Sequence, residues 1–193
     1  MKKCKITIIA LVTLFTTTLF AQETEEKTNG EQPKHEVSLD VLDLIALKKF
    51  EISYNYLLNE SESIGAQISF FPDNEDFWGS EGYQENFSLG FNYRHYFSKK
   101  YAQGFYVEGF TKYSSGKSYL QTNNDYEASD FKKYHALDIG FGLGYKYVSK
   151  RNFYIDANIN IRRSILSSIP TEKTDYYLPN ATSNIGLTIG KQF

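Results

Sequence analysis

An alternation of apolar and polar residues, which runs almost unbroken from residue 50 to the C-terminus, restricts the fold of this chain more than any other feature. The clearest run, residues 137–147, has Leu, Ile, Phe, Leu, Tyr and Tyr at its odd positions and Asp, Gly, Gly, Gly and Lys between them. Successive side chains of a β-strand point to opposite faces. A period of two therefore predicts strands with one apolar and one polar face, and hence an all-β protein.

Seven segments follow this pattern, and an eighth, less regular segment precedes them. The seven are residues 50–59, 64–70, 87–97, 105–113, 137–147, 153–162 and 184–193. The eighth extends from about Glu36 to Leu47 and has Val37 on its apolar face, but strict alternation would put Asp43 on that face too. A β-bulge near Leu42 would correct this by moving Leu42 and Leu44 to the apolar face. We therefore expect eight strands, the first of them bulged.

The connections between these strands are alternately short and long. The short ones are residues 60–63, 98–102 and 149–152, and the long ones are residues 72–84, 114–132 and 164–180. Outer-membrane barrels have an even number of antiparallel strands, short periplasmic turns and longer extracellular loops. The order of connections predicts an eight-stranded antiparallel up-and-down transmembrane β-barrel. The first link, Lys48–Lys49, is the exception, because it is tight where a loop is expected.

The C-terminal segment carries the most specific mark, an apolar face that ends on a terminal aromatic residue. Here the chain resembles the family of small eight-stranded outer-membrane barrels that includes OmpX and the transmembrane domain of OmpA, over about residues 36–193. The resemblance implies that the outer-membrane assembly machinery reads this strand. Its signal would consist of Ile185, Leu187, Ile189 and Phe193. Lys191 departs from the family pattern, although a Lys near the membrane interface can snorkel.

The first residues have the features of a secretory signal peptide. Three Lys residues precede the apolar run 6–20, and Ala21 follows it. The run is shorter than the roughly 20 residues of a membrane-spanning helix, so we expect cleavage after Ala21, with an uncleaved anchor as the alternative. Residues 22–35 form a polar lead-in that is expected to be disordered, and residues 36–193 form the barrel. The only Cys, Cys4, leaves with the signal, so the mature chain cannot form a disulfide.

Alternation alone does not tell whether the apolar face meets lipid or encloses a core. The alternative is a secreted, lipocalin-like barrel that binds an apolar ligand. Lipid is favoured because Tyr93, Tyr145 and Phe153 lie near short connections, as in an interfacial aromatic girdle, and because the polar face is rich in Gly, Ser and Asn. A net charge of −2 gives no reason to expect nucleic acid binding. We expect a monomer in the cell outer membrane, in contact with lipid and lipopolysaccharide.

The polar face would then line the barrel interior and carry charges of both signs. These are Glu51, Glu108, Asp138 and Asp156, with Arg94, Lys112, Lys146 and Arg162. An eight-stranded barrel is just wide enough for side chains to fill, and unpaired charge in a narrow lumen is costly. We expect a paired network that plugs the barrel, with a narrow proton, ion or solute path as the alternative.

The sequence offers no recognisable catalytic or cofactor motif. His35, His95 and His135 fall at different heights and are not expected to form a metal site or a catalytic triad. Ser114 and Ser115 are close enough to His135 in sequence to keep an enzyme such as a lipid acyltransferase as an alternative. We expect no enzyme, no cofactor and no metal.

Two of the long connections are acidic and aromatic, and they are the expected sites of any interaction. Candidate contacts are Asp73, Asp76, Trp78, Asp125 and Tyr126. Such loops could bind divalent cations that bridge lipopolysaccharide, or an extracellular partner. The alternative is that they are merely solvated. The expected role is structural or adhesive, carried out through the loops.

Overall fold

The computed structural model describes residues 32–193 except 72–81, 123–124, 170–175 and 177, and it describes no side chains for residues 121–130. The predicted signal peptide and most of the predicted lead-in lie outside the described residues. No helix in the described part of the chain has the length and apolarity needed to span a bilayer.

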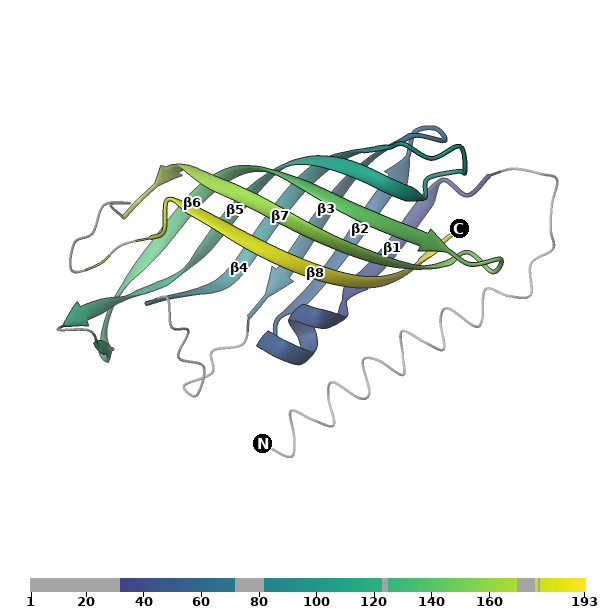
Figure 1. The fold of residues 1–193 in the computed structure, drawn as a ribbon. Coiled ribbons are helices and arrows are strands. Elements are labelled where there is room, and N and C mark those ends of the chain that lie inside the picture. The colour runs from purple at the N-terminus through teal and green to yellow at the C-terminus, as the bar shows by residue number, and fades with distance from the viewer. Residues whose placement is uncertain (1–31, 72–81, 123–124, 170–175, 177) are drawn as a thin grey trace, which may run out of the picture. The chain divides into compact units, whose positions relative to one another are not determined.

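Eight antiparallel strands form a closed barrel, in which each strand pairs with the next and the last pairs with the first (Figure 1). The strands are β1 (His35–Asp40), β2 (Phe50–Leu57), β3 (Glu62–Phe70), β4 (Tyr83–Tyr96), β5 (Gly104–Thr122), β6 (Asp125–Val148), β7 (Phe153–Ser167) and β8 (Ala181–Gln192). The predicted all-β, eight-stranded up-and-down barrel is confirmed.

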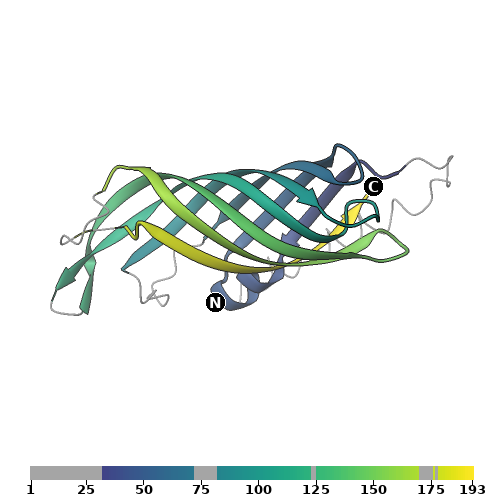
Figure 2. The same cartoon turned by 45° about the horizontal axis from the view of Figure 1, so that its top comes forward.

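The two ends of the barrel differ in their connections. The short links after β2, β4 and β6 lie at one end together with the start of β1 and the C-terminus, and we call this end the turn side (Figures 1 and 2). The link after β6 is closed by hydrogen bonds from the Asn152 N–H to the Ser149 carbonyl (3.0 Å) and from the Ser149 N–H to the Phe153 carbonyl (2.7 Å). The links after β1, β3, β5 and β7 lie at the opposite end, the loop side.

The prediction that the first strand continues to Leu47 through a bulge near Leu42 is wrong. β1 ends at Asp40, and residues 41–47 are helical, with η2 covering Asp43–Leu47. Asp40 starts the helical turn, because its Oδ1 accepts a hydrogen bond from the Asp43 N–H (2.9 Å). Lys48, at φ 56°, ends it. The first link is therefore a helical connection on the loop side, and the exception in the order of short and long links disappears.

The predicted loop 114–132 is also wrong, because most of it continues the flanking strands. β5 and β6 stay in register from Ser114↔Ala136 to Ser118↔Lys132 and pair again up to Thr122↔Asp125. The rings of Tyr119 and Phe131 contact each other across this hairpin, with centroids 6.2 Å apart. Backbone pairing and such cross-strand contacts hold strands together even where the two faces no longer differ in polarity. β4 and β7 likewise extend beyond their predicted loop-side ends.

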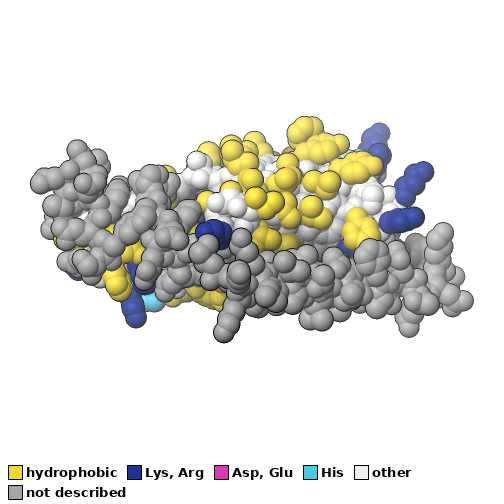
Figure 3. Space-filling model, turned by 90° about the horizontal axis from the view of Figure 1, so that it is seen from below, with side chains coloured by type: hydrophobic (Ala, Val, Ile, Leu, Met, Phe, Trp, Pro, Cys, Tyr) yellow, Lys and Arg dark blue, Asp and Glu magenta, His cyan; other side chains and the backbone are white. Residues whose placement is uncertain are grey.

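The barrel wall has its apolar face outside and its polar face inside. Hydrophobic side chains cover the outer wall on the face seen in Figure 3, and Phe141 is 61% exposed. On the inner face of the same strand, β6, Lys146 is fully buried. Inside, aromatic rings of one strand lie over glycines of the next, as Tyr106 does over Gly144 and Tyr154 over Gly190. The glycines of the polar face thus make room for large interior side chains.

Candidate functional site

The interior charges form two groups, and the first, which we call the turn-side cluster, consists of Glu36, Arg94, Glu108, Lys146 and Asp156. Lys146 Nζ lies 2.5 Å from Glu36 Oε1 and donates to Tyr96 Oη (2.9 Å). Arg94 contacts Glu108 through Nε and Asp156 through Nη1, the latter at 3.0 Å. These five charges come from β1, β4, β5, β6 and β7, so the cluster joins strands from all around the barrel.

Tyrosine rings and amides complete the turn-side cluster. Tyr106 Oη donates to Asp156 Oδ1 (2.7 Å), and its ring lies 4.7 Å from the Arg94 guanidinium carbon. Gln192 Nε2 donates to Glu36 Oε1 at 2.7 Å. Each charge is therefore paired, and tyrosine rings cover the two cations, which favours stable burial, although Glu36 Oε2 is buried without a hydrogen-bond partner.

The second group, the loop-side cluster, consists of Asp43, Lys49, Glu51, Glu85, Lys112, Asp138 and Arg162. Lys49 Nζ lies 2.8 Å from Asp43 Oδ2 and 2.9 Å from Glu51 Oε2. Lys112 Nζ lies 2.8 Å from Glu85 Oε1. Arg162 bridges Asp138 at 3.3 Å and Glu85 at 3.6 Å. The two pairs of Arg162 are longer than any pair of the turn-side cluster, and the Arg162 side chain is the most exposed of the charges in the two clusters' ion pairs.

A polar cavity of about 50 Å³ lies between the two clusters. Its walls include Glu51 and Lys112 from the loop-side cluster and Arg94 and Glu108 from the turn-side cluster. The volume is enough for a few water molecules and too small for most organic ligands. A smaller cavity of about 20 Å³ borders Asp138 and Arg162. Ion pairs between β4 and β7 span the lumen at both clusters, and this arrangement is that of a plug.

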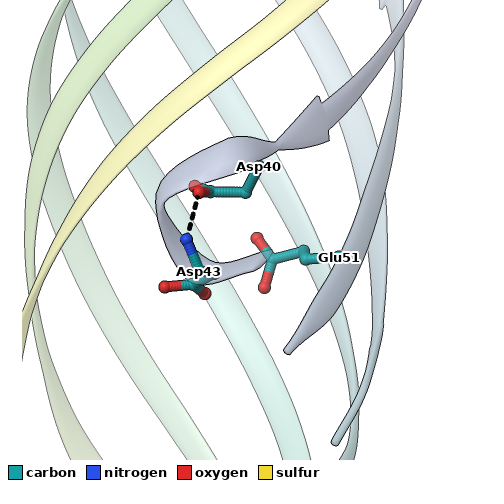
Figure 4. Close-up of side chains that lie close together, drawn as sticks. All are labelled: Asp40, Asp43 and Glu51. Carbon is teal, nitrogen blue, oxygen red and sulfur yellow. Dashed lines mark hydrogen bonds between the residues drawn. The ribbon is translucent and has the colours of Figure 1, made fainter. Parts of the chain in front are cut away.

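Three carboxylates, Asp40, Asp43 and Glu51, meet where β1 passes into η2 (Figure 4). Their oxygens lie within 4.8 Å of one another, a spacing that could hold a metal ion. The ammonium of Lys49 already bonds two of the three and supplies the positive charge. Burial opposes the charge on Lys49, but the carboxylates of Glu51, Glu85 and Asp43 outweigh it and raise its pKa above the ordinary value. The group is therefore an ion-pair network built around a lysine.

All eight charges that the sequence assigned to the interior line the lumen and belong to one of the two clusters. Sequence reasoning missed Glu36, Asp43, Lys49 and Glu85. Glu36 shares a face with Ser38, so the polar side of the first strand could have indicated it. Glu85 could not be found in this way, because a register shift between Glu85 and Phe87 turns it inward, whereas strict alternation would turn it outward.

The residues of the predicted assembly signal lie on the outer face of β8 and at its end. Ile185, Leu187, Ile189 and Phe193 are all exposed. Phe193 extends the seam between β1 and β8, because its N–H donates to the His35 carbonyl (2.9 Å) and its carbonyl accepts from the His35 N–H (3.0 Å). Its role as a signal stays a prediction.

The three histidines lie apart, and each contacts a different aromatic side chain. His35 Nδ1 bonds Tyr54 Oη (2.7 Å) on the turn side, and His135 Nδ1 bonds Tyr113 Oη (2.7 Å) on the loop side. His95 packs edge-on against Phe97. Ser114 is buried and on the inner face, whereas His135 is exposed on the outer face. Ser115 faces His135 in the ladder, but the hydrogen bond of that imidazole goes to Tyr113.

The candidate loop contacts remain predictions. Asp73, Asp76 and Trp78 lie outside the described residues. Asp125 and Tyr126 are the first residues of β6, and their side chains are not described.

Comparison with known proteins gives a likeness to solved structures. No family model matches the chain. No curated protein matches it either. Among solved structures, the crystal structure of the N-terminal β-barrel domain of Pseudomonas aeruginosa OprF is similar, with a TM-score of 0.46 and 14% sequence identity over 84% of this chain and 98% of that one.

Proposed function

We propose that this chain is a small β-barrel of a Gram-negative outer membrane, with a structural or adhesive role that its loop side carries out. One observation carries the proposal: the outer wall is apolar, and the inside is charged. Side chains such as Phe141, Leu143 and Ile185 are exposed, whereas Glu36 and Lys146 are completely buried. In water the exposed apolar wall would cost free energy, whereas in a bilayer it is favourable, and the interior charges are then kept away from lipid.

The same observation argues against a soluble barrel that binds an apolar ligand. Such a barrel needs an apolar interior, but the cavity here is lined by Asp40, Glu51, Arg94 and other polar groups. An apolar ligand would have to displace the water around these charges without replacing its hydrogen bonds. A conduit is also disfavoured, because one salt bridge of each cluster, Arg94–Asp156 and Arg162–Glu85, joins β4 to β7 across the lumen.

In this proposal the barrel works as a rigid scaffold for its loop side. The ladder of β5 and β6 continues past the last β4 partner, Ser118, and carries the hairpin beyond its neighbours. Long exposed connections on a rigid scaffold are where proteins usually place binding contacts. No arrangement of described residues supplies a nucleophile, a base and an oxyanion site together, so the proposal includes no catalysis.

The first experiment locates the protein and then removes the hairpin. We expect the mature chain in the outer-membrane fraction, as a compact band in unboiled gels that shifts on heating. Recovery from the periplasm or medium without detergent would overturn the membrane assignment.

Replacing residues 118–132 by Asn-Gly leaves Lys117 opposite Lys133 and provides a tight turn. This variant should keep the heat-shifting band and lose attachment of cells to surfaces, whereas unchanged attachment would count against a role of the hairpin.

A further inference from the structure

The barrel wall differs in height around its circumference. β5 and β6 have 19 and 24 residues, but β1 has six and β2 has eight. A membrane-spanning strand needs about 9–11 residues. The six residues of β1 extend about 20 Å along a tilted strand, which is less than the apolar band of about 25 Å on outer-membrane barrels. On the loop side, the helical connection joins the last residue of β1 to the first residue of β2 (Figures 1 and 2).

The connection at this low point of the wall is apolar. Asp43 is the one polar residue in the segment 41–47, which reads Val-Leu-Asp-Leu-Ile-Ala-Leu. Ile45 is 81% exposed and Leu42 is 37% exposed. A water-exposed loop of this composition would be unfavourable, because loops are normally polar and large apolar side chains are normally covered.

The polar groups of this connection point to the lumen and hold it in position. Asp43 is buried, accepts a hydrogen bond from Lys49 Nζ (2.8 Å) through its side chain and another from the Lys49 N–H (3.1 Å) through its carbonyl. Asp40 and Glu51 complete the attachment from β1 and β2 (Figure 4). The helical turn is thus fixed by its polar side, and its apolar side remains without a partner in the described part of the chain.

We propose that segment 41–47, centred on Ile45, is a membrane-contacting surface whose partner is the acyl chains of the bilayer. This inference rests on the proposed membrane location. The segment completes the lipid-facing surface where β1 and β2 are too short to span the hydrocarbon, and it continues the apolar outer face of those strands. A helical turn suits this task better than an extended loop, because some of its backbone groups bond within the connection, as the Lys48 and Lys49 N–H groups do to the Asp43 carbonyl.

Single tryptophans test this contact directly. Trp78 is the only Trp of the chain, so Trp78→Phe gives a background without tryptophan. Into it we would introduce Ile45→Trp, the lipid control Phe141→Trp and the water control Asn59→Trp, which lies in an exposed turn. The variants are refolded into phosphatidylcholine vesicles with bromine near the headgroup end or the methyl end of the acyl chains, and the heat-shifting band verifies folding.

We expect the emission of Ile45→Trp to be quenched at least half as strongly as that of Phe141→Trp, and more by bromine near the headgroup, as for an interfacial residue. Quenching no greater than for Asn59→Trp, with Phe141→Trp quenched, would overturn the inference and leave the membrane location intact. No quenching of Phe141→Trp in a folded barrel would overturn both. Quenching of Ile45→Trp that rises strongly on dilution with lipid would mean that a second copy covers the segment, which would also overturn the inference.

Discussion

The turn-side and loop-side clusters are built from the same side-chain types but differ in how completely water is excluded from them. The Lys146 and Glu36 side chains are 0% exposed, whereas the Arg162 side chain is 20% exposed. Tyrosine rings cover Arg94 and Lys146 on the turn side. Both clusters border the cavity between them, and the loop-side cluster also borders a second, smaller cavity through Asp138 and Arg162. When one partner of a fully buried ion pair is removed, the other charge is left with neither a counter-ion nor water, whereas a partly exposed charge is still hydrated. The same kind of substitution should therefore lower the stability of the two clusters by different amounts.

The largest effect is expected from Lys146→Met. This change leaves Glu36 buried without its cation, and breaking a fully buried pair in this way costs about 3–5 kcal/mol. Urea unfolding in lipid vesicles, followed by tryptophan fluorescence, measures the loss. The double variant Lys146→Met/Glu36→Gln removes the orphaned charge and should recover much of it. A loss below about 1 kcal/mol for the single variant would mean that water reaches Glu36 and that the turn-side cluster is not dry.

The next comparison replaces one arginine in each cluster. Arg94→Met leaves Glu108 and Asp156 without their shared guanidinium, and we expect a loss of about 2–4 kcal/mol. Arg162→Met should cost only about 1–2 kcal/mol, because its site is partly hydrated and Lys112 remains beside Glu85. Equal losses would remove the distinction between the clusters. Planar-bilayer recordings separate plug from conduit: a changed single-channel current with unchanged stability in either variant would favour a conduit.

Much of the barrel could be predicted from the sequence, because a strand with an apolar outer face and a polar inner face must present apolar residues at alternate positions. That constraint acts on residues 137–147 and 184–193 in full, and both are strands. It does not act where the chain leaves the wall. Asp40 starts a helical turn through a bond to the backbone of Asp43, and the alternation contains no signal for this. The β5–β6 hairpin was missed for the opposite reason, because its strands continue after the difference between the faces has faded.

The interior charges were predictable to the same extent and for the same reason. Residues at even positions of β5 and β6, such as Glu108 and Asp138, inherit their direction from the pattern. Glu85 does not, because the register shift next to it reverses the faces, and Lys49 lies outside any strand. Which charges pair depends on strand register and barrel closure, as with Glu36 and Lys146, which are far apart in sequence. Alternation fixes the direction of a side chain but not its partner.

A smaller effect on stability is expected from two glycine substitutions that compare the packing of the inner and the outer face next to the turn-side cluster. A Cβ on Gly144 would overlap the ring of Tyr106, which bonds Asp156. We expect Gly144→Ala to cost about 1–3 kcal/mol through overpacking. Gly109 faces outward and has open space around it, so Gly109→Ala should be neutral or stabilise by up to about 1 kcal/mol through lower entropy of the unfolded chain. Thermal shifts of the heat-modifiable band compare the two, and equal shifts would contradict tight packing around Tyr106.

The smallest effect on stability, with a large effect on yield, is expected from deletion of Phe193. The residue belongs to the turn side and bonds His35 through its N–H and its carbonyl, while its ring is 47% exposed. Losing these bonds at an exposed chain end should cost about 1 kcal/mol in molecules that have folded.

Closure itself depends on the pairing of β1 with β8, which covers only Glu36–Asp40 and Thr188–Gln192. An open edge in hydrocarbon leaves several backbone groups unsatisfied, so a barrel that fails to close should not persist in the membrane. If Phe193 is part of a signal for assembly, the deletion variant yields much less of the heat-shifting band in cells but unfolds at nearly the same urea concentration after refolding in vitro. Accumulation of that band at wild-type levels would mean that Phe193 only covers the seam. A large loss of stability in vitro would instead make it a structural element of the turn side, comparable to Lys146.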